Sequence, residues 1–446
     1  MRSACAVYRW LGPILGALLL LSSCATLRED VPRGKPSIAP APDPAAPLGV
    51  LSAEHIKAIG GASAFRLLDS GQAALAARMA LIEQARHSLD LQYYIFRSDT
   101  AGKLMMDALI RAAERGVRVR LLLDDMYSPE NEPTLIGLDA QPRIQVRLFN
   151  PFRVRGNAPL GRFMEFLTSD GRVNRRMHNK LFLADNHFGI AGGRNIGDEY
   201  FQADDAVAFR DLDVLATGPV VQELSRAFDK YWNAEQVVTT RALPRGSESR
   251  QALRDALKLE VAALRTSQAD SMTGFQRIDV LGAAHGSGWG PWTGGAAEIL
   301  IDEPGKTNKE VKKSDLPVGQ LLRHGREVRR ELLIASPYFV PGEKGVEWLR
   351  QIQMQDGVKV RVLTNSLAAT DVAVVHAGYA KYRRPLLAAG VQLHELKPLR
   401  EAGEPALLWH DQRADGEVIH QFDPRTSAVL RGYINVLSLL PIEGEL

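Results

Sequence analysis

Cysteine is scarce in this sequence, and its scarcity narrows the classes of protein that fit. The 446 residues include two cysteines, Cys5 and Cys24. Cys5 falls in the apolar N-terminal stretch, so the remaining chain holds one thiol, which excludes an internal disulfide framework and a multi-thiolate metal site. An excess of one charge is also missing, because 55 basic and 52 acidic residues give a formal net charge of +3. A nucleic-acid binder usually carries a basic stripe, so we expect no nucleic-acid partner.

A long apolar run is absent from the N-terminus, although a short one is present. Residues 11–21 are apolar and follow two arginines, but they are too few for a typical membrane-spanning helix. The following Leu21-Ser-Ser-Cys24 resembles a bacterial lipobox, which implies a signal peptide over 1–23 and a lipid anchor on Cys24. The resemblance places the protein in the cell envelope as a lipoprotein, on the periplasmic face of a membrane. The outer membrane is slightly favoured because the residue after Cys24 is not Asp. A plain secretory signal or an uncleaved anchor is the alternative.

Residues 24–50 follow the lipobox and have the composition of a tether. Six prolines between residues 28 and 50 remove backbone donors and favour extended conformations. We therefore expect a semi-rigid stalk that holds a catalytic body away from the bilayer. A disordered linker without a spacing role fits the same composition.

From residue 51 on, helical and strand patterns alternate, which is typical of an α/β protein. The pattern predicts helices over 73–86, 102–115 and 220–233, and strands over 88–96, 117–124, 144–148 and 212–216. We expect a mixed sheet flanked by helices. The predicted organisation is a first lobe over 51–245, a linker over 246–275 and a second lobe over 276–446.

The most informative stretch is His178-Asn-Lys180-Leu-Phe-Leu-Ala-Asp185, followed by Gly192-Gly193-Arg-Asn195. Its alternation predicts a strand, a turn at 185–186 and a return strand, with His178 and Lys180 on one face. An imidazole can attack phosphorus or carry a proton, and the neighbouring ammonium can hold a phosphate oxygen. Two successive glycines let backbone amides approach an anion, and Asp185 is placed to orient or charge-balance nearby groups.

An internal repeat indicates that the second lobe resembles the first. Arg115-Gly-Val-Arg-Val-Arg-Leu-Leu122 matches Asp356-Gly-Val-Lys-Val-Arg-Val-Leu363, at an offset of 357 − 116 = 241 residues. That offset puts a second histidine near 419, where His420 is found, but Phe422 replaces the lysine of the motif. No lysine occurs after Lys397. The second copy of the histidine–lysine motif is therefore missing, and an internal deletion of several dozen residues explains its loss.

The motif around His178 resembles the HxKxxxxD signature of the phospholipase D superfamily, with its trailing G-G-x-N. Ser336-Pro-Tyr338-Phe-Val-Pro-Gly342 and Leu437-Ser-Leu-Leu-Pro-Ile-Glu443 resemble the cardiolipin-synthase-like branch. The resemblance implies two similar lobes, the second one truncated, and a phosphatidyltransferase or phosphodiesterase that works through a phosphohistidine, without a metal or another cofactor. By this resemblance the catalytic residues are His178, Lys180 and Asp185. The predicted substrate-binding residues are Gly192, Gly193, Asn195, Tyr94 and Asp124. Tyr94 and Asp124 lie at predicted strand ends, where a structural role is the alternative.

Three functional readings follow from the missing half. The first is a phospholipid enzyme acting on phosphatidylglycerol or phosphatidylethanolamine, impaired by the loss of one histidine and one lysine. The second is a homodimeric phosphodiesterase or nuclease that pairs two His178 motifs, although a near-neutral body argues against a nucleic-acid substrate. The third is an inactive lipid- or phosphate-binding pseudoenzyme, because a lost hairpin leaves an unpaired strand edge.

Overall fold

The computed structural model divides into two compact units, one formed mainly by residues up to Gly294 and one mainly by residues from Gly295 on. The residues that the structure describes are 26–28, 30–61, 63–155, 159–169, 171–201, 209, 211–244, 246–267, 281–282, 291–295, 297–305, 325, 328–355, 357–370, 372–396, 409–411 and 419–420. The predicted signal peptide and Cys24 lie outside them. Among these residues, none of the helices has the length and apolar content needed to cross a bilayer.

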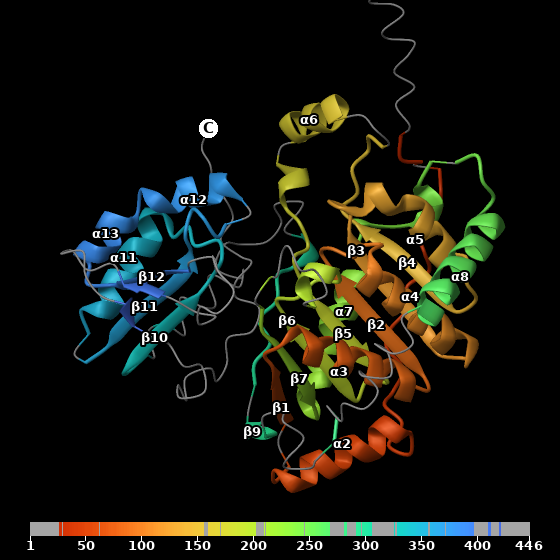
Figure 1. Ribbon diagram of the computed structural model, residues 1–446, viewed down its shortest axis with the longest axis horizontal. Helices are drawn as coiled ribbons and strands as arrows, with labels where there is room; N and C mark the ends of the chain where they lie inside the picture. Colours follow the sequence, from red (N-terminus) through yellow and green to blue (C-terminus); the bar gives the residue numbers. More distant parts are fainter. Residues whose placement is uncertain are drawn as a thin grey trace, which may run out of the picture. The chain divides into compact units, whose positions relative to one another are not determined.

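The first unit contains a nine-stranded mixed sheet (Figure 1). Its strands are β1 (Ser63–Leu68), β2 (Ser88–Tyr93), β3 (Arg118–Asp124), β4 (Ile144–Phe149), β5 (Leu181–Ala184), β6 (Phe188–Gly192), β7 (Asp213–Thr217), β8 (Val237–Thr239) and β9 (Thr293–Gly295). The spatial order is β8-β4-β3-β2-β5-β6-β7-β1-β9. Strands β2, β3 and β4 run parallel, whereas β5 and β8 are antiparallel to their neighbours β2 and β4.

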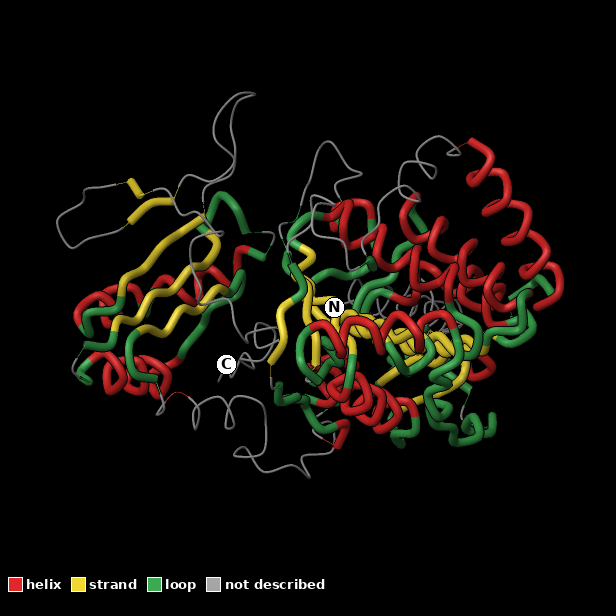
Figure 2. Tube along the Cα trace, turned by 90° about the horizontal axis from the view of Figure 1, so that it is seen from below, coloured by secondary structure: helices red, strands yellow, loops and turns green. Residues whose placement is uncertain are grey.

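The helices of the first unit lie on either side of this sheet (Figure 2). They are α2 (Pro47–Ala58), α3 (Gly71–Gln84), α4 (Thr100–Glu114), α5 (Glu132–Asp139), α6 (Pro159–Thr168), α7 (Pro219–Trp232) and α8 (Arg250–Ser267). Short 3-10 turns occur at Ser128–Asn131, Arg172–Asn174, Asp198–Tyr200 and Thr240–Ala242. Helices α3 and α4 begin two residues before their predicted starts, because Ser70 and Asp99 accept hydrogen bonds from amides three residues ahead.

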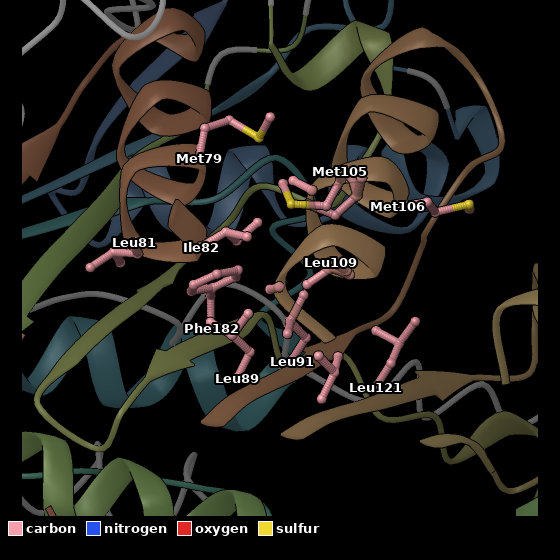
Figure 3. Packing of buried hydrophobic residues seen from close by; sticks show 14 of the residues in the cluster. Met79, Leu81, Ile82, Leu89, Leu91, Met105, Met106, Leu109, Leu121 and Phe182 are labelled. Atoms are coloured by element: carbon pink, nitrogen blue, oxygen red, sulfur yellow. The ribbon is translucent and has the colours of Figure 1, made fainter. Parts of the chain in front are cut away.

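Strand alternation divides the core into two faces. Leu91, Leu121 and Phe182 point toward Ile82 of α3 and Leu109 of α4, and all of these side chains are buried (Figure 3). The residues between them in sequence point the other way, toward α7. Every strand of this region is therefore buried on both faces, as the continuous apolar run at 117–124 predicts.

The face covered by α7 contains a buried arginine. Arg120 makes a bidentate ion pair with Asp90, at 2.6 and 2.7 Å, and a third bond of 2.7 Å to Asp229 of α7. Its guanidinium also lies 4.8 Å from the centre of the Phe228 ring. Such a buried charge is tolerated only when all of its donors find acceptors.

The predicted stalk is wrong for the residues from 26 on, because this segment packs along the first unit. We call residues 26–46, which precede α2, the strap. The carbonyl of Lys35 accepts a 2.6 Å bond from Arg147, and the carbonyl of Ser37 accepts a 2.9 Å bond from Arg120. The backbone N–H of Ala39 donates to Asp229 at 2.9 Å. The carbonyls of Lys35 and Ser37 therefore satisfy buried arginines instead of binding water.

The predicted linker over 246–275 also requires correction. Its first part forms α8, which packs against α4 and α5 through buried Leu257 and Val261. Arg265 of α8 bonds Asp107 of α4 at 2.9 Å. Trp292 packs on His55, with ring centroids 4.3 Å apart. The first unit therefore extends well past residue 245, because an amphipathic helix with charged ends buries its apolar face on the nearest lobe.

The second unit repeats part of the first. Its elements are β10 (Glu331–Ala335), α11 (Gly342–Gln353), β11 (Lys359–Asn365), α12 (Ala373–Ala380), α13 (Arg383–Ala388), β12 (Gln392–Leu396), β13 (Trp409–Asp411) and β14 (Ile419–His420). Strands β10, β11 and β12 are parallel and β13 is antiparallel to β12, which matches β2, β3, β4 and β8. The predicted repeat is confirmed. Among the described residues, β10 lacks a strand on the side where its counterpart β2 binds β5.

Candidate functional site

The candidate site lies where the carboxyl ends of β2, β3 and β4 meet. Because β5 is antiparallel to β2, with Gln92 opposite Leu181, the residues just before β5 lie at this same edge. The predicted hairpin is confirmed as β5, a turn and β6. Asp185 and Asn186 of the turn both have positive φ, 49° and 56°, the conformation of a tight two-residue hairpin turn that Asp and Asn tolerate.

His178 and Lys180 contact each other at this edge. The Lys180 Nζ lies 2.8 Å from Nδ1 and 3.3 Å from Nε2 of His178, and it donates a 2.8 Å bond to the His178 carbonyl. An ammonium has only donors, so the ring nitrogen that it contacts acts as an acceptor. The arrangement therefore places a neutral imidazole, whose accepting nitrogen faces the ammonium, beside a buried positive charge.

Tyr94 forms one wall of the site. Its ring lies 4.6 Å from the His178 ring, centre to centre, and the Lys180 Nζ lies 5.5 Å from the Tyr94 centroid. Burial raises the pKa of Tyr94, and nearby Asp124 raises it further, so its hydroxyl stays protonated at neutral pH. The structure thus brings together three of the predicted residues: a tyrosine, a histidine and a lysine.

Asp124 is buried at the end of β3 and bonds neighbouring groups of the chain, and its predicted role in binding substrate stays a prediction. One carboxylate oxygen accepts bonds of 2.8 and 2.6 Å from Arg176, and the other accepts the backbone N–H of Met177 at 2.7 Å. Burial raises the pKa of Asp124, while the Arg176 guanidinium opposes that shift. Asp124 therefore positions the backbone immediately before His178.

Asp185, which was expected to orient or charge-balance nearby groups, bonds the backbone at the start of β2. Its two oxygens accept backbone N–H bonds from Arg86, His87 and Ser88, at 2.8, 2.8 and 2.9 Å. Five residues separate it from Lys180, which at about 3.3 Å per strand residue is roughly 16 Å. The predicted catalytic role is replaced by a structural one, because Asp185 fixes the start of β2 at the opposite edge of the sheet.

The predicted anion-binding residues at the end of β6 and just after it contact neighbouring parts of the chain. A Cβ on Gly192 would lie 1.9 Å from Asp213, so this glycine is required for close packing. The N–H of Gly193 donates to the Leu212 carbonyl at 3.1 Å. The side chain of Asn195, buried, accepts from the Ile95 amide at 3.0 Å and donates to the Tyr200 hydroxyl at 2.8 Å. Asn195 thus holds the backbone next to Tyr94.

Comparison with known proteins decides the family. A model described as "Cardiolipin synthase, PLD-like domain" matches residues 79–232, a stretch that contains the whole candidate site. The chain is 43% identical to cardiolipin synthase C of Escherichia coli over 338 residues, which cover 75% of this chain and 69% of that protein. The chain belongs to the cardiolipin synthase family of phospholipase D-like proteins. An uncharacterized protein of Helicobacter pylori is 32% identical over 365 residues, covering 79% of this chain and 69% of that protein.

A solved structure is similar to this cardiolipin synthase family member at lower identity. It is the phosphatidylserine synthase of Haemophilus influenzae, 12% identical with a TM-score of 0.49, covering 81% of this chain and 80% of that one. Among the residues that the structure describes, no group of three histidine, cysteine or acidic side chains is placed to hold a metal ion.

Arg176 is a residue of the site that sequence reasoning missed. It lies two residues before His178. Its guanidinium forms an ion pair with Asp124 and lies 5.2 Å from the centre of the Phe152 ring. The signal in the sequence was the pair Arg175-Arg176 directly before the motif. An arginine that follows a strand-terminal acid by 52 residues cannot be paired with it by spacing alone.

Replacing Asp185 with alanine should lower stability without removing the reactive groups. The change leaves three backbone donors without their acceptor, and we expect the free energy of unfolding to fall by about 2–4 kcal/mol. Urea unfolding measures this loss. Asp185→Asn is the matched control, because it keeps one acceptor and tolerates positive φ, so it should lose less. An alanine variant of unchanged stability would contradict this role.

Proposed function

We propose that the protein is a phosphatidyltransferase or phosphodiesterase acting on phospholipids. The observation that carries the proposal is the contact between His178, Lys180 and the Tyr94 ring at the carboxyl edge of the sheet. A nucleophilic nitrogen beside a buried ammonium suits a phosphodiester, whose phosphorus is attacked while its oxygens remain negatively charged. Membership of the cardiolipin synthase family supports a phospholipid as the substrate class.

The proposed chemistry proceeds in two displacements. A ring nitrogen of His178 attacks phosphorus, a P–N bond forms, and the P–O bond to the leaving alcohol breaks. The leaving alkoxide takes a proton from a second acid, and Lys180 balances the charge of the non-bridging oxygens. Water or an alcohol then attacks the phosphohistidine, loses its proton to the same group, and releases phosphatidic acid or a new phosphodiester. Cardiolipin is the product when phosphatidylglycerol is both donor and acceptor.

The proposed mechanism also needs a second acid, which the motif around His178 does not itself provide. The proposed source is a second copy of the chain, whose His178 would face the first one across a two-fold axis. A site without such a partner would bind a phosphodiester and turn it over slowly or not at all. The state of association is therefore part of the functional proposal.

The proposed location is the cell envelope, with the protein held as a lipoprotein through Cys24. The Leu21-Ser-Ser-Cys24 stretch supports this location. A lipid on Cys24 would keep the site near phosphatidylglycerol and phosphatidylethanolamine, the proposed substrates.

The test uses a chain beginning at residue 26, incubated with phosphatidylglycerol vesicles with and without phosphatidylethanolamine. Mass spectrometry follows cardiolipin and phosphatidic acid, and analytical ultracentrifugation gives the state of association. Product formation that rises with the dimer fraction supports the proposal and its shared site. A folded chain that binds the vesicles without forming either product would establish a binding protein and reject the enzymatic function.

A further inference from the structure

Three apolar side chains of helix α6 are exposed, which is unusual for a helix of a globular protein. Phe163, Met164 and Leu167 are 57%, 49% and 59% exposed. At 100° per residue these three positions fall within a 100° arc, so they form one apolar stripe. A surface helix normally turns such a stripe toward the core. In Figure 1, α6 (yellow) stands apart from the sheet and from the helices that cover it.

The polar side of α6 is the one that contacts the body of the unit. Glu165 accepts the backbone N–H groups of Arg153 and Val154, at 2.9 and 3.1 Å, and pairs with Arg172 at 2.6 Å. The Arg162 guanidinium lies 5.4 Å from the Phe152 ring. The helix is therefore fixed by charged and polar groups, with its apolar stripe directed away from them. These specific bonds fix the orientation of the helix.

Arginines are frequent in the segment that contains α6, and three of them are paired with acids: Arg155 with Asp125 and Glu132, Arg172 with Glu165, and Arg176 with Asp124. Residues 151–178 contain six arginines and two acidic residues, in a chain whose total charge is nearly balanced. Arg153 is exposed at the base of the helix, and Arg175 is half-buried just before His178. An apolar stripe bordered by arginines is complementary to a lipid bilayer, whose interior is apolar and whose headgroups can be anionic.

The strap begins at the base of the same helix. Thr26 forms a β-bridge with Val154, and the Leu27 amide donates to the Arg153 carbonyl at 2.8 Å. Two residues span at most about 7 Å. A lipid on Cys24 would therefore leave the chain next to α6 and the carboxyl edge of the sheet.

We propose that α6 is an interfacial helix that inserts Phe163, Met164 and Leu167 into a bilayer containing anionic phospholipid. The arginines lie at headgroup level, and the His178 edge faces the lipid. This attachment is separate from turnover at His178, so it can hold even if the site proves inactive.

The test reports the depth of residue 164 directly. The full-length chain carries Cys5→Ser, Cys24→Ser and Met164→Cys, and the new thiol bears an environment-sensitive fluorophore. With vesicles of phosphatidylglycerol and phosphatidylcholine, we expect a blue shift and quenching by nitroxide groups on the acyl chains. Vesicles of phosphatidylcholine alone should give a weaker response. Because the N-terminal leader can itself bind vesicles, the position of the probe, and not binding of the chain, is the readout.

Leu259 provides the matched control, since it is 74% exposed on α8 of the same unit. A probe at Leu259→Cys should remain in water, and adding Phe163→Glu with Leu167→Glu should abolish the response at position 164. Thermal unfolding checks that these exposed substitutions leave the fold intact. A probe at position 164 that stays in water on vesicle-bound protein would overturn the proposal. So would one already shielded without lipid, which would show that another part of the protein covers α6.

Discussion

Replacing His178 with alanine should reduce product formation from phosphatidylglycerol vesicles by about a thousandfold or more. The variant loses the nitrogen proposed to bond phosphorus, and losses of a nucleophile or a general acid–base group commonly have effects of this size. His178 is half-buried and contacts Tyr94 and Lys180 at the surface of the sheet edge, so the fold should survive its removal. Initial rates of cardiolipin and phosphatidic acid formation measure the effect.

Two further variants separate the roles within the motif. Lys180→Ala removes the charge that holds the phosphate oxygens and should also lose most activity, whereas Lys180→Arg keeps the charge and should lose less. Asn179→Ala changes the residue between them and should stay within a few-fold of the parent chain. Equal rates in the parent and His178→Ala would place the chemistry elsewhere, whatever the family resemblance.

Removing the strap should have the largest effect on stability. A chain that begins at Pro47 keeps α2 but loses the Ser37 and Lys35 carbonyls, which accept from Arg120 and Arg147, and the N–H bond to Asp229. Each buried donor left without a partner costs about 1–3 kcal/mol. Burial already lowers the pKa of Arg147 to about 10, which shows how poorly its charge is hydrated. The sum of these losses is comparable with the whole stability of many domains, about 5–15 kcal/mol.

The measurement compares urea and thermal unfolding of chains that begin at residues 26 and 47. We expect the shorter chain to unfold in several molar less urea or to fail to fold. Ile38 lies within the strap but is 69% exposed, so Ile38→Ala should match the parent and show that the effect comes from the buried contacts. A chain from Pro47 with parental stability would restore the view of residues 26–46 as a simple tether.

The strap marks the limit of what the sequence could predict about the fold. The hairpin at His178, the mixed sheet flanked by helices and the repeat were predicted correctly, because each depends on a pattern of neighbouring residues. The strap depends on contacts with arginines more than 80 residues away, which no local pattern records. Its prolines predicted an extended backbone, but an extended backbone is equally suited to a stalk and to packing on a lobe.

The candidate site shows the same division. His178 and Lys180 are two residues apart on an extended segment, so their proximity was predictable. Asp185 belongs to the same motif, yet the length of β5 carries it to the other edge of the sheet. Motif membership therefore did not imply a common location. The contacts of Asp124 could not be predicted, because its ion-pair partner Arg176 is 52 residues away in sequence and only the fold brings the two together.

The strap also determines the order in which the first unit can be completed. Its amide and side-chain bonds reach residues such as Asn233, which lies 196 positions from Ser37. Contacts of such long sequence separation form late, because closing the long loop between the two residues costs conformational entropy of the chain. A chain that emerges N-terminus first must therefore hold these residues unbound until α7 exists. Such late contacts act mainly on the rate of unfolding. The strap is synthesised before the other elements of the first unit, yet it should bind last and slow the unfolding of that unit.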